Sequence, residues 1–423
     1  MKNISMKSPA AAILTIGNEI LSGKTINTNA SFIAQELGKI GVQVTSVISV
    51  GDDDKAIKRG LKHALTFADI IIATGGLGPT RDDITKKAVA DFFHRTIAID
   101  PKQLRIVQNR FSAMGYDKMP ENNITQAEIP DGARIFPNPR GTAPGLMIRD
   151  KETRCFMLPG VPDEMTLLMT EHVIPYLKHH LRNDITILYR TIRTTGIGES
   201  KLAELLDPVL GSLESPVVAY LPSPKGVDIR LTVKGTNQKE LKEKIKNIEN
   251  RIIFLASEYV YGFDDDTLEK IVGELLRRHN LTIAVAESCT GGLIGHRLTE
   301  IPGSSDYLDQ AIVAYSNRSK IELLGVKSET LETFGAVSEQ TAQEMAEGIR
   351  KTSTCDIGAA TTGIAGPTGG TPQKPVGLVY IAIADKFDTI TKQLNLYGER
   401  SRIKIQASQA LLNLLRKHLN EKY

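Results

Sequence analysis

The sequence predicts an α/β protein in which two α/β domains with parallel-rich sheets are joined by a small α+β module. The chain has 423 residues, which is longer than a domain with a single hydrophobic core usually is, and this length indicates two or three domains. Its first and last sections alternate apolar, strand-like runs with amphipathic helical stretches, a pattern typical of parallel sheets. The middle section lacks this alternation. We therefore expect domains over residues 1–175, 176–257 and 258–423.

The first domain begins with a short β-type run at residues 11–17. An amphipathic helix is expected at 29–41, a second strand and helix follow, and a strongly apolar strand spans 69–76. The apolar face of the 29–41 helix consists of Phe32, Ile33, Leu37 and Ile40. Ligands of parallel sheets bind beyond the carboxyl ends of the strands. The loop TGGLGPTRDD after the last of these strands is therefore a candidate ligand site.

The middle module has a different pattern. ITILYRTIRTTG predicts a strand, GESKLAELLDPVL a helix, and VVAYLPSPKGVDIRLTVKG a two-stranded hairpin. A charged helix, NQKELKEKIKNIENRIIFLA, closes the module. Its lysines and glutamates are mixed in sign, which favours a solvated outer face over a binding patch.

The last domain returns to alternating strands and helices. LTIAVAES, QAIVAYSN, CDIGAATTGIAG and GLVYIAIAD predict strands, the second of them ending at Tyr315. The chain closes with a helix that carries one apolar stripe. The stripe consists of Ile403, Ala407, Ala410, Leu411, Leu414 and Leu415.

The composition, 41% hydrophobic and 24% charged with a net charge of +3, is that of a soluble globular protein. It gives no reason to expect a nucleic-acid or membrane-surface partner. Three cysteines without a CxxC spacing argue against disulfides and structural zinc, and fit a cytoplasmic location. The apolar run at 10–16 follows Lys2 and Lys7, but it is too short for a signal peptide and predicts a strand. No apolar stretch reaches membrane-spanning length.

The stretch VAESCTGG (285–292) runs from an apolar strand into a turn that opens a helix. Such a turn presents side chains and backbone N–H groups to anions and oxyanions, and paired glycines allow close approach. Ser288 is a candidate nucleophile. In the simpler interpretation, Ser288 or Thr290 only caps the helix. Cys289 is a rival nucleophile, although no histidine is suitably placed to activate it.

A serine nucleophile needs a base, and Lys320 is the candidate because it opens a helix just after an apolar strand. Burial or cationic neighbours would lower its pKa, as in Ser-Lys enzymes. Alternatively, Lys320 is an ordinary lysine of a first helical turn. Two further features, the loop ATTGIAGPTGG (360–370) and Arg402 at the start of the terminal helix, are suited to gripping a phosphate or carboxylate. Together these features predict one crevice.

In this last domain the chain resembles the CinA family through AESCTGG, YSNRSKIELLGV, GAVSEQTA, TTGIAGPTGGTPQKPVG and GERSRIKIQA. The resemblance implies a nicotinamide-nucleotide amidase, which converts nicotinamide mononucleotide to nicotinate mononucleotide and ammonia without metal or cofactor. It implies Ser288 as nucleophile, with Lys320 and Tyr315 as proton-transfer partners. The substrate would be held by Thr290, Gly291, Gly292, Thr362, Gly363, Ala365 and Arg402, with backbone N–H groups from Thr290 to Gly292 stabilising the oxyanion.

The first domain resembles the family's molybdopterin-binding-like domain through IGNEILSGKTINTNASFIA, TGGLGPTRDDITKKAVA, NPRGTAPG and LPGVPDEM. The resemblance implies metal-dependent ADP-ribose pyrophosphatase activity, with Mg, Mn or Co as the divalent metal. Asp83, with Asp82 and Glu19, would hold the metal on a diphosphate; alternatively, these aspartates only begin a helix. The nucleotide site is expected to comprise Glu19, Asn27, Asn29, Gly75, Gly76, Gly78, Asp82, Thr85 and Gly141.

The middle module resembles a KH domain by its order of strands and helices. Glu199 stands where a GxxG loop needs its second glycine, so RNA binding is unsupported and a spacer or dimer-contact role in a homodimer is expected. The leading interpretation is an enzyme with two sites, acting on nicotinamide mononucleotide and ADP-ribose. One alternative is an amidase fused to a non-catalytic nucleotide or pterin sensor. Another is an accessory protein in DNA uptake or recombination, against which the balanced charge argues.

Overall fold

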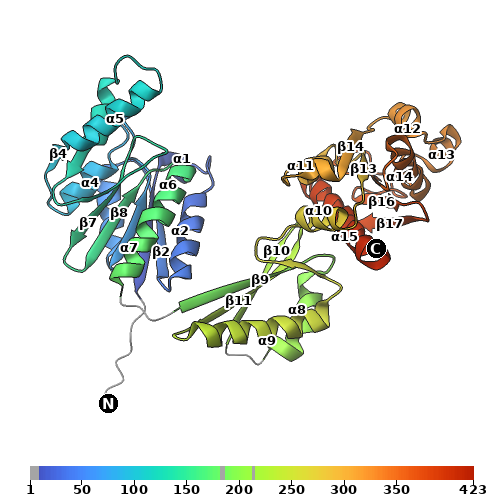
Figure 1. The fold of residues 1–423 in the computed structure, drawn as a ribbon, viewed down its shortest axis with the longest axis horizontal. Helices are drawn as coiled ribbons and strands as arrows, with labels where there is room; N and C mark the ends of the chain where they lie inside the picture. The colour runs from blue at the N-terminus through green and yellow to red at the C-terminus, as the bar shows by residue number, and fades with distance from the viewer. Residues whose placement is uncertain (1–8, 182–185, 212–214) are drawn as a thin grey trace. The chain divides into compact units, whose positions relative to one another are not determined.

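A computed structural model of the chain describes residues 9–181, 186–211 and 215–423. The chain divides into two compact units, the first made of residues up to 188 with 233–242, and the second of 189–232 with 243–423 (Figure 1). The apolar run near the N-terminus forms a buried strand, while Lys2 and Lys7 lie outside the described residues. Within the described ranges, no helix combines the length and apolar character needed to cross a membrane.

A six-stranded sheet forms the centre of the first unit. In spatial order its strands are β2 (Gln43–Val50), β1 (Ala10–Ile16), β3 (Ile70–Thr74), β8 (Thr153–Leu158), β7 (Gly145–Asp150) and β6 (Arg134–Phe136). The first four strands run parallel, and β7 and β6 are antiparallel to their neighbours. The carboxyl ends of β1 and β3 therefore meet at one edge, where the glycine-rich loop begins.

Helices cover both faces of this sheet because successive residues of a strand point to opposite sides. Ile13 of β1 packs with α2, α6 and α7, whereas Leu14 packs with α3 and α4. The helices of the unit are α1 (Asn18–Leu21), α2 (Thr28–Lys39), α3 (Asp54–Ala64), α4 (Thr85–Phe92), α5 (Pro101–Ala113), α6 (Pro162–Leu168) and α7 (Ile174–His180). The short pair β4 (Ile97–Ile99) and β5 (Glu128–Pro130), a 3-10 helix (Glu121–Ala127) and a π-helical turn (Met169–Val173) complete it.

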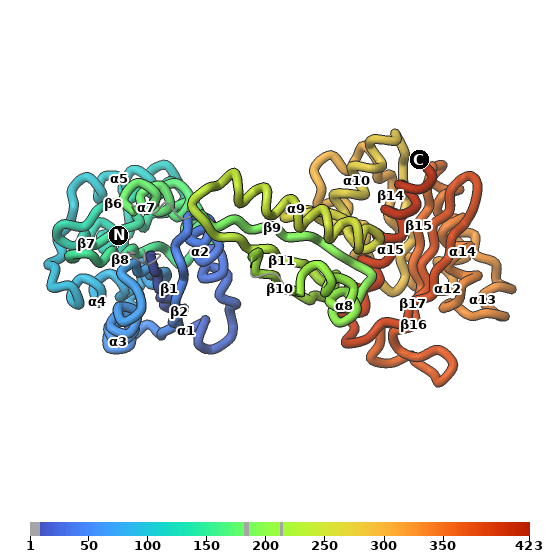
Figure 2. Tube along the Cα trace, turned by 90° about the horizontal axis from the view of Figure 1, so that it is seen from below, coloured from blue at the N-terminus to red at the C-terminus, as the bar shows by residue number. Residues whose placement is uncertain are grey.

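The second unit begins with a four-stranded sheet in the order β10 (Val217–Ser223), β11 (Gly226–Gly235), β9 (Thr186–Thr194) and β12 (Val260–Phe263). Figure 2 shows β9, β11 and β10 side by side. Two helices, α8 (Glu199–Leu210) and α9 (Gln238–Ala256), accompany the sheet. Ile192, Leu206 and Ile229 belong to one small core shared by sheet and helices.

A five-stranded sheet follows, in the order β14 (Leu308–Val313), β13 (Ile283–Glu287), β15 (Ile357–Gly363), β16 (Leu378–Ala384) and β17 (Thr389–Asn395). β13 is parallel to both neighbours, and β16 and β17 are antiparallel. One core contains residues of α10 (Leu268–Arg278), α11 (Leu293–Thr299) and α15 (Arg400–Lys422), the helix drawn in red in Figure 2. The other contains residues of α12 (Asn317–Leu324), α13 (Ser328–Phe334) and α14 (Glu339–Ser353). A 3-10 turn (Ser304–Asp306) precedes β14.

The predicted fold class is confirmed: α/β units with parallel strands at their centres and a small α+β module. In the two larger sheets the antiparallel strands lie on one side of the parallel ones, and the pattern in the sequence is weaker at the edge strand β17. β17 has no continuous apolar run, because much of this edge strand is exposed. The prediction that the strand before Lys320 ends at Tyr315 was wrong, since β14 ends at Val313.

Candidate active site

Ser288 follows the last residue of β13, and its backbone N–H donates to the Thr361 carbonyl of β15 at 3.0 Å. Ser288 is 8% exposed. The next residues form a tight turn, in which Gly291 and Gly292 have positive φ angles of 59° and 90°, and α11 begins directly afterwards. Thr290 is fully buried, and its hydroxyl lies 2.7 Å from that of Thr361. This turn is thus held to the central strands of the sheet.

Glu287, and not Ser288 or Thr290, occupies the amino end of α11. Its buried carboxylate accepts hydrogen bonds from the N–H groups of Gly292, Ile294 and Gly295 at 2.8–3.1 Å. A carboxylate at this position satisfies otherwise unpaired helix donors and opposes the helix dipole. The interpretation that Ser288 merely caps the helix is therefore wrong.

The expected oxyanion donors are only partly free. The Gly292 N–H is bonded to Glu287, and the Gly291 N–H donates to the Ser288 carbonyl at 3.2 Å. The Thr290 N–H has no acceptor among the described residues. Of the three N–H groups from Thr290 to Gly292, that of Thr290 remains available to a bound substrate.

Lys320 lies in the first turn of α12, yet it is 1% exposed. Its Nζ lies 3.2 Å from the Ser288 Oγ, 2.9 Å from the Ala314 carbonyl and 3.3 Å from the Tyr315 carbonyl. Within the described ranges no carboxylate forms an ion pair with it. Burial lowers the pKa of Lys320 from its usual value near 10.5, because the charged form loses its hydration.

The three oxygen neighbours of this nitrogen would accept from the three N–H groups of an ammonium, and they are also compatible with an uncharged amine. A neutral lysine has two N–H donors and one lone pair, since loss of a proton from the ammonium group frees an acceptor site. Its two donors suit the Ala314 and Tyr315 carbonyls, and its lone pair then faces the Ser288 hydroxyl. The arrangement can accept the serine proton.

Cys289 is a poor rival nucleophile. It is 6% exposed, and burial raises the pKa of its thiol to about 11. A thiol is nucleophilic only as the thiolate, which this environment disfavours.

Tyr315 contacts Lys320 through its backbone carbonyl. Its side chain is 61% exposed, and its hydroxyl accepts a hydrogen bond from Arg400 at 3.0 Å. No hydrogen bond joins this hydroxyl to Ser288 or Lys320 in the described part of the chain. The contacts therefore connect the Tyr315 side chain with Arg400 and not with the serine–lysine pair.

A cavity of about 700 Å³ adjoins this region, lined in part by Ala365, Pro367 and the start of α15. Leu293, the first residue of α11, also lines it, and a Cβ added at Gly291 would meet the Lys404 Nζ at 3.5 Å. Arg400 lines the cavity and donates to the Gly366 carbonyl at 2.8 Å. The cavity is thus bordered by the first residue of α11, just after the serine turn, by the loop after β15 and by two basic side chains, whereas Ser288 itself is not among the lining residues.

Arg402, the predicted anion clamp, does not line this cavity. It lines a separate cavity on another side of α15. Two residues apart on an α-helix, side chains point in directions that differ by roughly 200°. Arg400, two residues earlier, occupies the position expected of Arg402. The helical register explains why the two arginines line different cavities.

Thr362 and Gly363 belong to β15 and not to a loop. The Thr362 hydroxyl donates to the Ala336 carbonyl at 2.6 Å, and a Cβ at Gly363 would lie 2.6 Å from the Val379 side chain. These two residues therefore support strand pairing and a neighbouring loop. Of the predicted set in this segment, Ala365 lines the cavity.

The first unit has its own cavity, about 590 Å³, at the carboxyl ends of β1 and β3. It is bordered by six of the predicted residues: Glu19, Gly75, Gly76, Gly78, Asp82 and Asp83. The backbone conformation explains the first glycine of the loop, since Gly75 has a φ of 107° and a Cβ there would lie 2.0 Å from the Ile16 carbonyl oxygen. The glycines bring the backbone itself to the cavity wall.

Four other predicted residues of this unit have structural contacts. The Asn27 side chain accepts from the Ala30 N–H and caps α2, and Asn29 donates to the Gly160 carbonyl at 2.8 Å. Thr85 is 1% exposed beside Gly76, and Gly141 lies against the Glu164 carboxylate. None of the four lines the cavity of about 590 Å³, but Asn27 and Asn29 line a smaller cavity of about 90 Å³ that shares Glu19 and Gly75 with it.

The acidic residues do not form a ready-made metal site. In the described ranges no group of three or more His, Cys, Asp or Glu side chains is arranged to hold a metal ion. Asp83 accepts from the Thr80 N–H and hydroxyl at 2.8 and 2.6 Å, so it closes the loop but does not cap α4. Carboxylate oxygens suit a hard cation, but a bound diphosphate would have to supply further ligands.

The structure also places residues in these cavities that sequence reasoning missed. Asp52 and Glu164 line the first cavity, and Arg400 and Lys404 line the cavity near Ser288. Asp52 has a signal in the strand pattern, because it follows a strand whose carboxyl end shares an edge with β1. Glu164 lies in the motif LPGVPDEM, and Arg400 and Lys404 lie in GERSRIKIQA, but hydrophobic periodicity alone does not point to them.

Comparisons with known proteins agree with this architecture. Residues 265–419 match the family described as "CinA C-terminal domain", 189–262 the "Damage-inducible protein CinA KH domain", and 12–179 the "Probable molybdopterin binding domain". A competence-damage inducible protein of Thermoanaerobacter pseudethanolicus is 42% identical over 96% of this chain and 98% of its own length. One of Caldicellulosiruptor saccharolyticus is also 42% identical over the same shares.

Among solved structures, a competence/damage inducible protein from Agrobacterium tumefaciens is 43% identical, over 36% of this chain and 96% of its own, with a TM-score of 0.34. The resemblance drawn from the motifs is confirmed, and the middle module is a KH domain of the kind found in these proteins. With a molybdopterin-binding-like domain, a CinA KH domain and a CinA C-terminal domain in this order, the chain belongs to the CinA family.

Proposed function

We propose that the C-terminal domain hydrolyses the carboxamide of nicotinamide mononucleotide to nicotinate mononucleotide and ammonia. One observation supports this most strongly: a buried lysine, which forms no ion pair with any carboxylate in the described part of the chain, lies 3.2 Å from the Ser288 hydroxyl. Burying a cation without an anion costs several kcal/mol, so the site favours the neutral amine. A neutral amine beside a serine is the arrangement of a Ser-Lys hydrolase.

The reaction proceeds in two halves. Lys320 takes the proton of Ser288 as Oγ bonds to the amide carbon, and the Thr290 N–H donates to the oxyanion. The C–N bond then breaks, and the Lys320 ammonium returns its proton to the departing nitrogen, which leaves as ammonia. Water, deprotonated by Lys320, attacks the acyl ester and releases the carboxylate and Ser288. Loss of one oxyanion donor typically raises the barrier by about 3 kcal/mol.

The neighbouring cavity of about 700 Å³ is large enough for a mononucleotide. Arg400 and Lys404, both on the first turns of α15, would pair with its phosphate, since guanidinium and ammonium groups are strong phosphate ligands. Apolar contacts from Leu293 and Val376 would pack against a ring.

The test is ammonia release from nicotinamide mononucleotide by the full chain. We expect the Ser288→Ala variant to lose ammonia release, whereas Ser305→Ala, a change at an exposed serine of the turn before β14, keeps it. Trapping an acyl ester on Ser288 by mass spectrometry would identify the nucleophile. Ammonia release that survives the loss of the Ser288 hydroxyl would refute the mechanism.

For the N-terminal domain we propose binding of a nucleotide diphosphate, ADP-ribose, with hydrolysis of its diphosphate bond. The glycine-lined cavity of about 590 Å³ supports this, because its loop offers backbone N–H groups to phosphate oxygens. A divalent metal (Mg, Mn or Co), held by Asp83 with Asp82 and Glu19, would supply positive charge to the diphosphate. AMP formed from ADP-ribose only when metal is added would support hydrolysis. Binding without AMP would favour the alternative, a non-catalytic sensor domain.

A further inference from the structure

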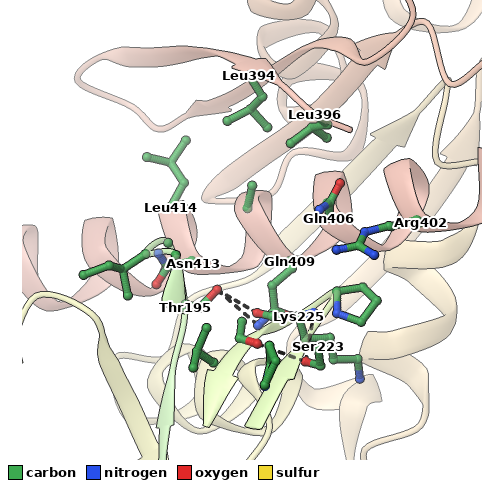
Figure 3. A pocket seen from close by; sticks show the side chains of 18 of the residues that line it. Thr195, Ser223, Lys225, Leu394, Leu396, Arg402, Gln406, Gln409, Asn413 and Leu414 are labelled. Atoms are coloured by element: carbon green, nitrogen blue, oxygen red, sulfur yellow. Dashed lines mark hydrogen bonds between the residues drawn. The ribbon is translucent and has the colours of Figure 1, made fainter. Parts of the chain in front are cut away.

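The second unit contains another cavity, about 470 Å³ in volume, which shares no lining residue with the cavity near Ser288. Four segments border it: the loop before α8, the turn between β10 and β11, the strand β17 with the residue after it, and one side of α15. Figure 3 shows the side chains of α15 between those of Leu394 and Leu396 and those of Thr195, Ser223 and Lys225. The cavity thus lies between the KH sheet and the C-terminal domain, inside one compact unit.

The walls of this cavity carry an excess of positive charge. Arg402, Lys392, Lys225 and Lys417 line it, against a single carboxylate, Glu199. Lys225 and Lys417 are paired with carboxylates outside the lining, Glu269 and Glu258. Among the described residues, Arg402 and Lys392 form no ion pair. Two cations that face one cavity and form no ion pair among the described residues favour an anionic occupant, although the pKa of Glu258, lowered mainly by its hydrogen bond with Lys417, is also lowered by the charge of Lys392.

The amino end of α8 adds to this preference. The helix has 12 residues and begins at Glu199, an acidic residue on the cavity wall, and no side chain of the described residues caps its first N–H groups. Unpaired N–H groups and the positive end of the helix dipole both favour an anion, of which phosphate is the usual case.

The remaining wall is suited to the rest of such a molecule. Leu394, Leu396 and Leu414 supply apolar surface that is not fully covered by the protein. The Gln406 side chain also lines this part of the wall.

We propose that this cavity is a second ligand site of the unit, which binds a phosphorylated nucleoside-type compound. The phosphate lies between Arg402, Lys392 and the amino end of α8, and the ring packs on the leucines. Its volume is within the range of about 300–1,000 Å³ that is typical of small-molecule sites. The site is separate from the Ser288 centre and does not depend on the reaction proposed there.

The test uses the absence of tryptophan from the natural sequence. In the full chain, Leu414→Trp places a single fluorophore in the cavity wall, and Phe254→Trp places one at a position that is 85% exposed and outside the cavity. AMP is the probe, with adenosine and inorganic phosphate as its two parts. We expect saturable fluorescence change with AMP in the first reporter only, and weaker binding of each part alone.

In the Leu414→Trp background, Arg402→Ala should weaken AMP binding by about tenfold or more, as expected for loss of a charge-assisted hydrogen bond. Lys392→Met should weaken it as well, and added salt should act in the same direction. A second reporter, Leu394→Trp, repeats the measurement if the first variant does not fold.

Absence of any response to AMP in both cavity reporters at millimolar concentration would overturn the proposal. A response that Arg402→Ala and Lys392→Met leave unchanged would also overturn it. Tighter binding of an adenylate oligonucleotide than of AMP, lost in the same variants, would replace the small-molecule site by a nucleic-acid groove.

Discussion

At the scale of single residues, the most informative side chain is Lys320. A lysine in a first helical turn is normally solvated, but here the loop between β14 and α12 folds over it and its amine meets only oxygen atoms without charge. The direction of its pKa shift follows from this burial.

A first prediction concerns activity and pH. Because the neutral amine is the base, kcat/KM for nicotinamide mononucleotide should rise with pH and level off above the lowered pKa of Lys320. The variant Lys320→Met should lose activity by about 10²–10⁴-fold, the usual contribution of a general base. Rates measured from pH 6 to pH 10 check both statements. A kcat/KM that falls as the pH rises through this range would contradict a neutral base.

A second prediction concerns stability. Since the folded-state pKa of Lys320 lies below the unfolded value near 10.5, the unfolded chain binds more protons in the window between the two values. The contribution of Lys320 to the free energy of unfolding should therefore become more favourable as the pH rises towards 10.5. Urea unfolding of the natural chain and of Lys320→Met at several alkaline pH values gives this difference. An increase of the Lys320→Met stability relative to the natural chain over the same window would show the opposite sign.

At the scale of elements, the surroundings of the serine turn depend on how the helices α11 and α15 begin. α11 starts on the Glu287 carboxylate, which leaves Ser288 free, and α15 starts with basic residues that face two different cavities.

A third prediction tests the start of α11. Glu287→Gln retains the shape of the side chain but removes the charge and one acceptor oxygen from a buried group of hydrogen bonds. We expect a loss of about 1–3 kcal/mol in unfolding free energy and reduced ammonia release, because the serine turn loosens. Glu300→Gln, at the exposed carboxyl end of the same helix, is the matched control. Equal stability of the two variants would show that Glu287 does not hold the turn.

A fourth prediction separates the two arginines at the start of α15. Arg400→Ala should raise KM for nicotinamide mononucleotide about tenfold, through loss of a charge-assisted phosphate contact, and Arg402→Ala should raise it much less. Steady-state kinetics of both variants, beside Arg318→Ala at an exposed position of α12, measure this order. The reverse order would restore the assignment that the sequence alone suggested.

At the scale of the whole molecule, the two proposed hydrolytic sites lie in separate compact units. The nucleotide sites proposed for both end domains lie near the carboxyl ends of parallel strands, where loops are free to vary without disturbing the sheets.

A fifth prediction follows from this separation. Ser288→Ala should abolish ammonia release and leave AMP formation from ADP-ribose unchanged, and Asp83→Ala should do the opposite. Chromatography of the products, with and without added divalent metal, measures both ammonia release and AMP formation for each of the two variants. Loss of both products in either variant at full folded content would show that the two sites are not independent.

Much of the fold follows from the sequence because hydrophobic periodicity is a local property. The runs at 69–76 and 281–288 are apolar on both faces, as in strands buried within a sheet, and the helix at 29–41 carries its apolar stripe at the expected spacing. The edge strand β17 escaped prediction because a strand with one exposed face and one free edge needs no apolar run.

The candidate active site could be predicted from the sequence only in part. The sequence alone determined the family, the fold class and the candidate pair Ser288 and Lys320, since these depend on motifs and on residue type. Only the tertiary structure decided that Lys320 is buried, that Glu287 holds the helix end, and that Arg400 and Arg402 face different cavities. The physical reason is that burial, hydrogen-bond partners and the side of a helix that meets a cavity are set by segments far apart in the chain, which local patterns do not record.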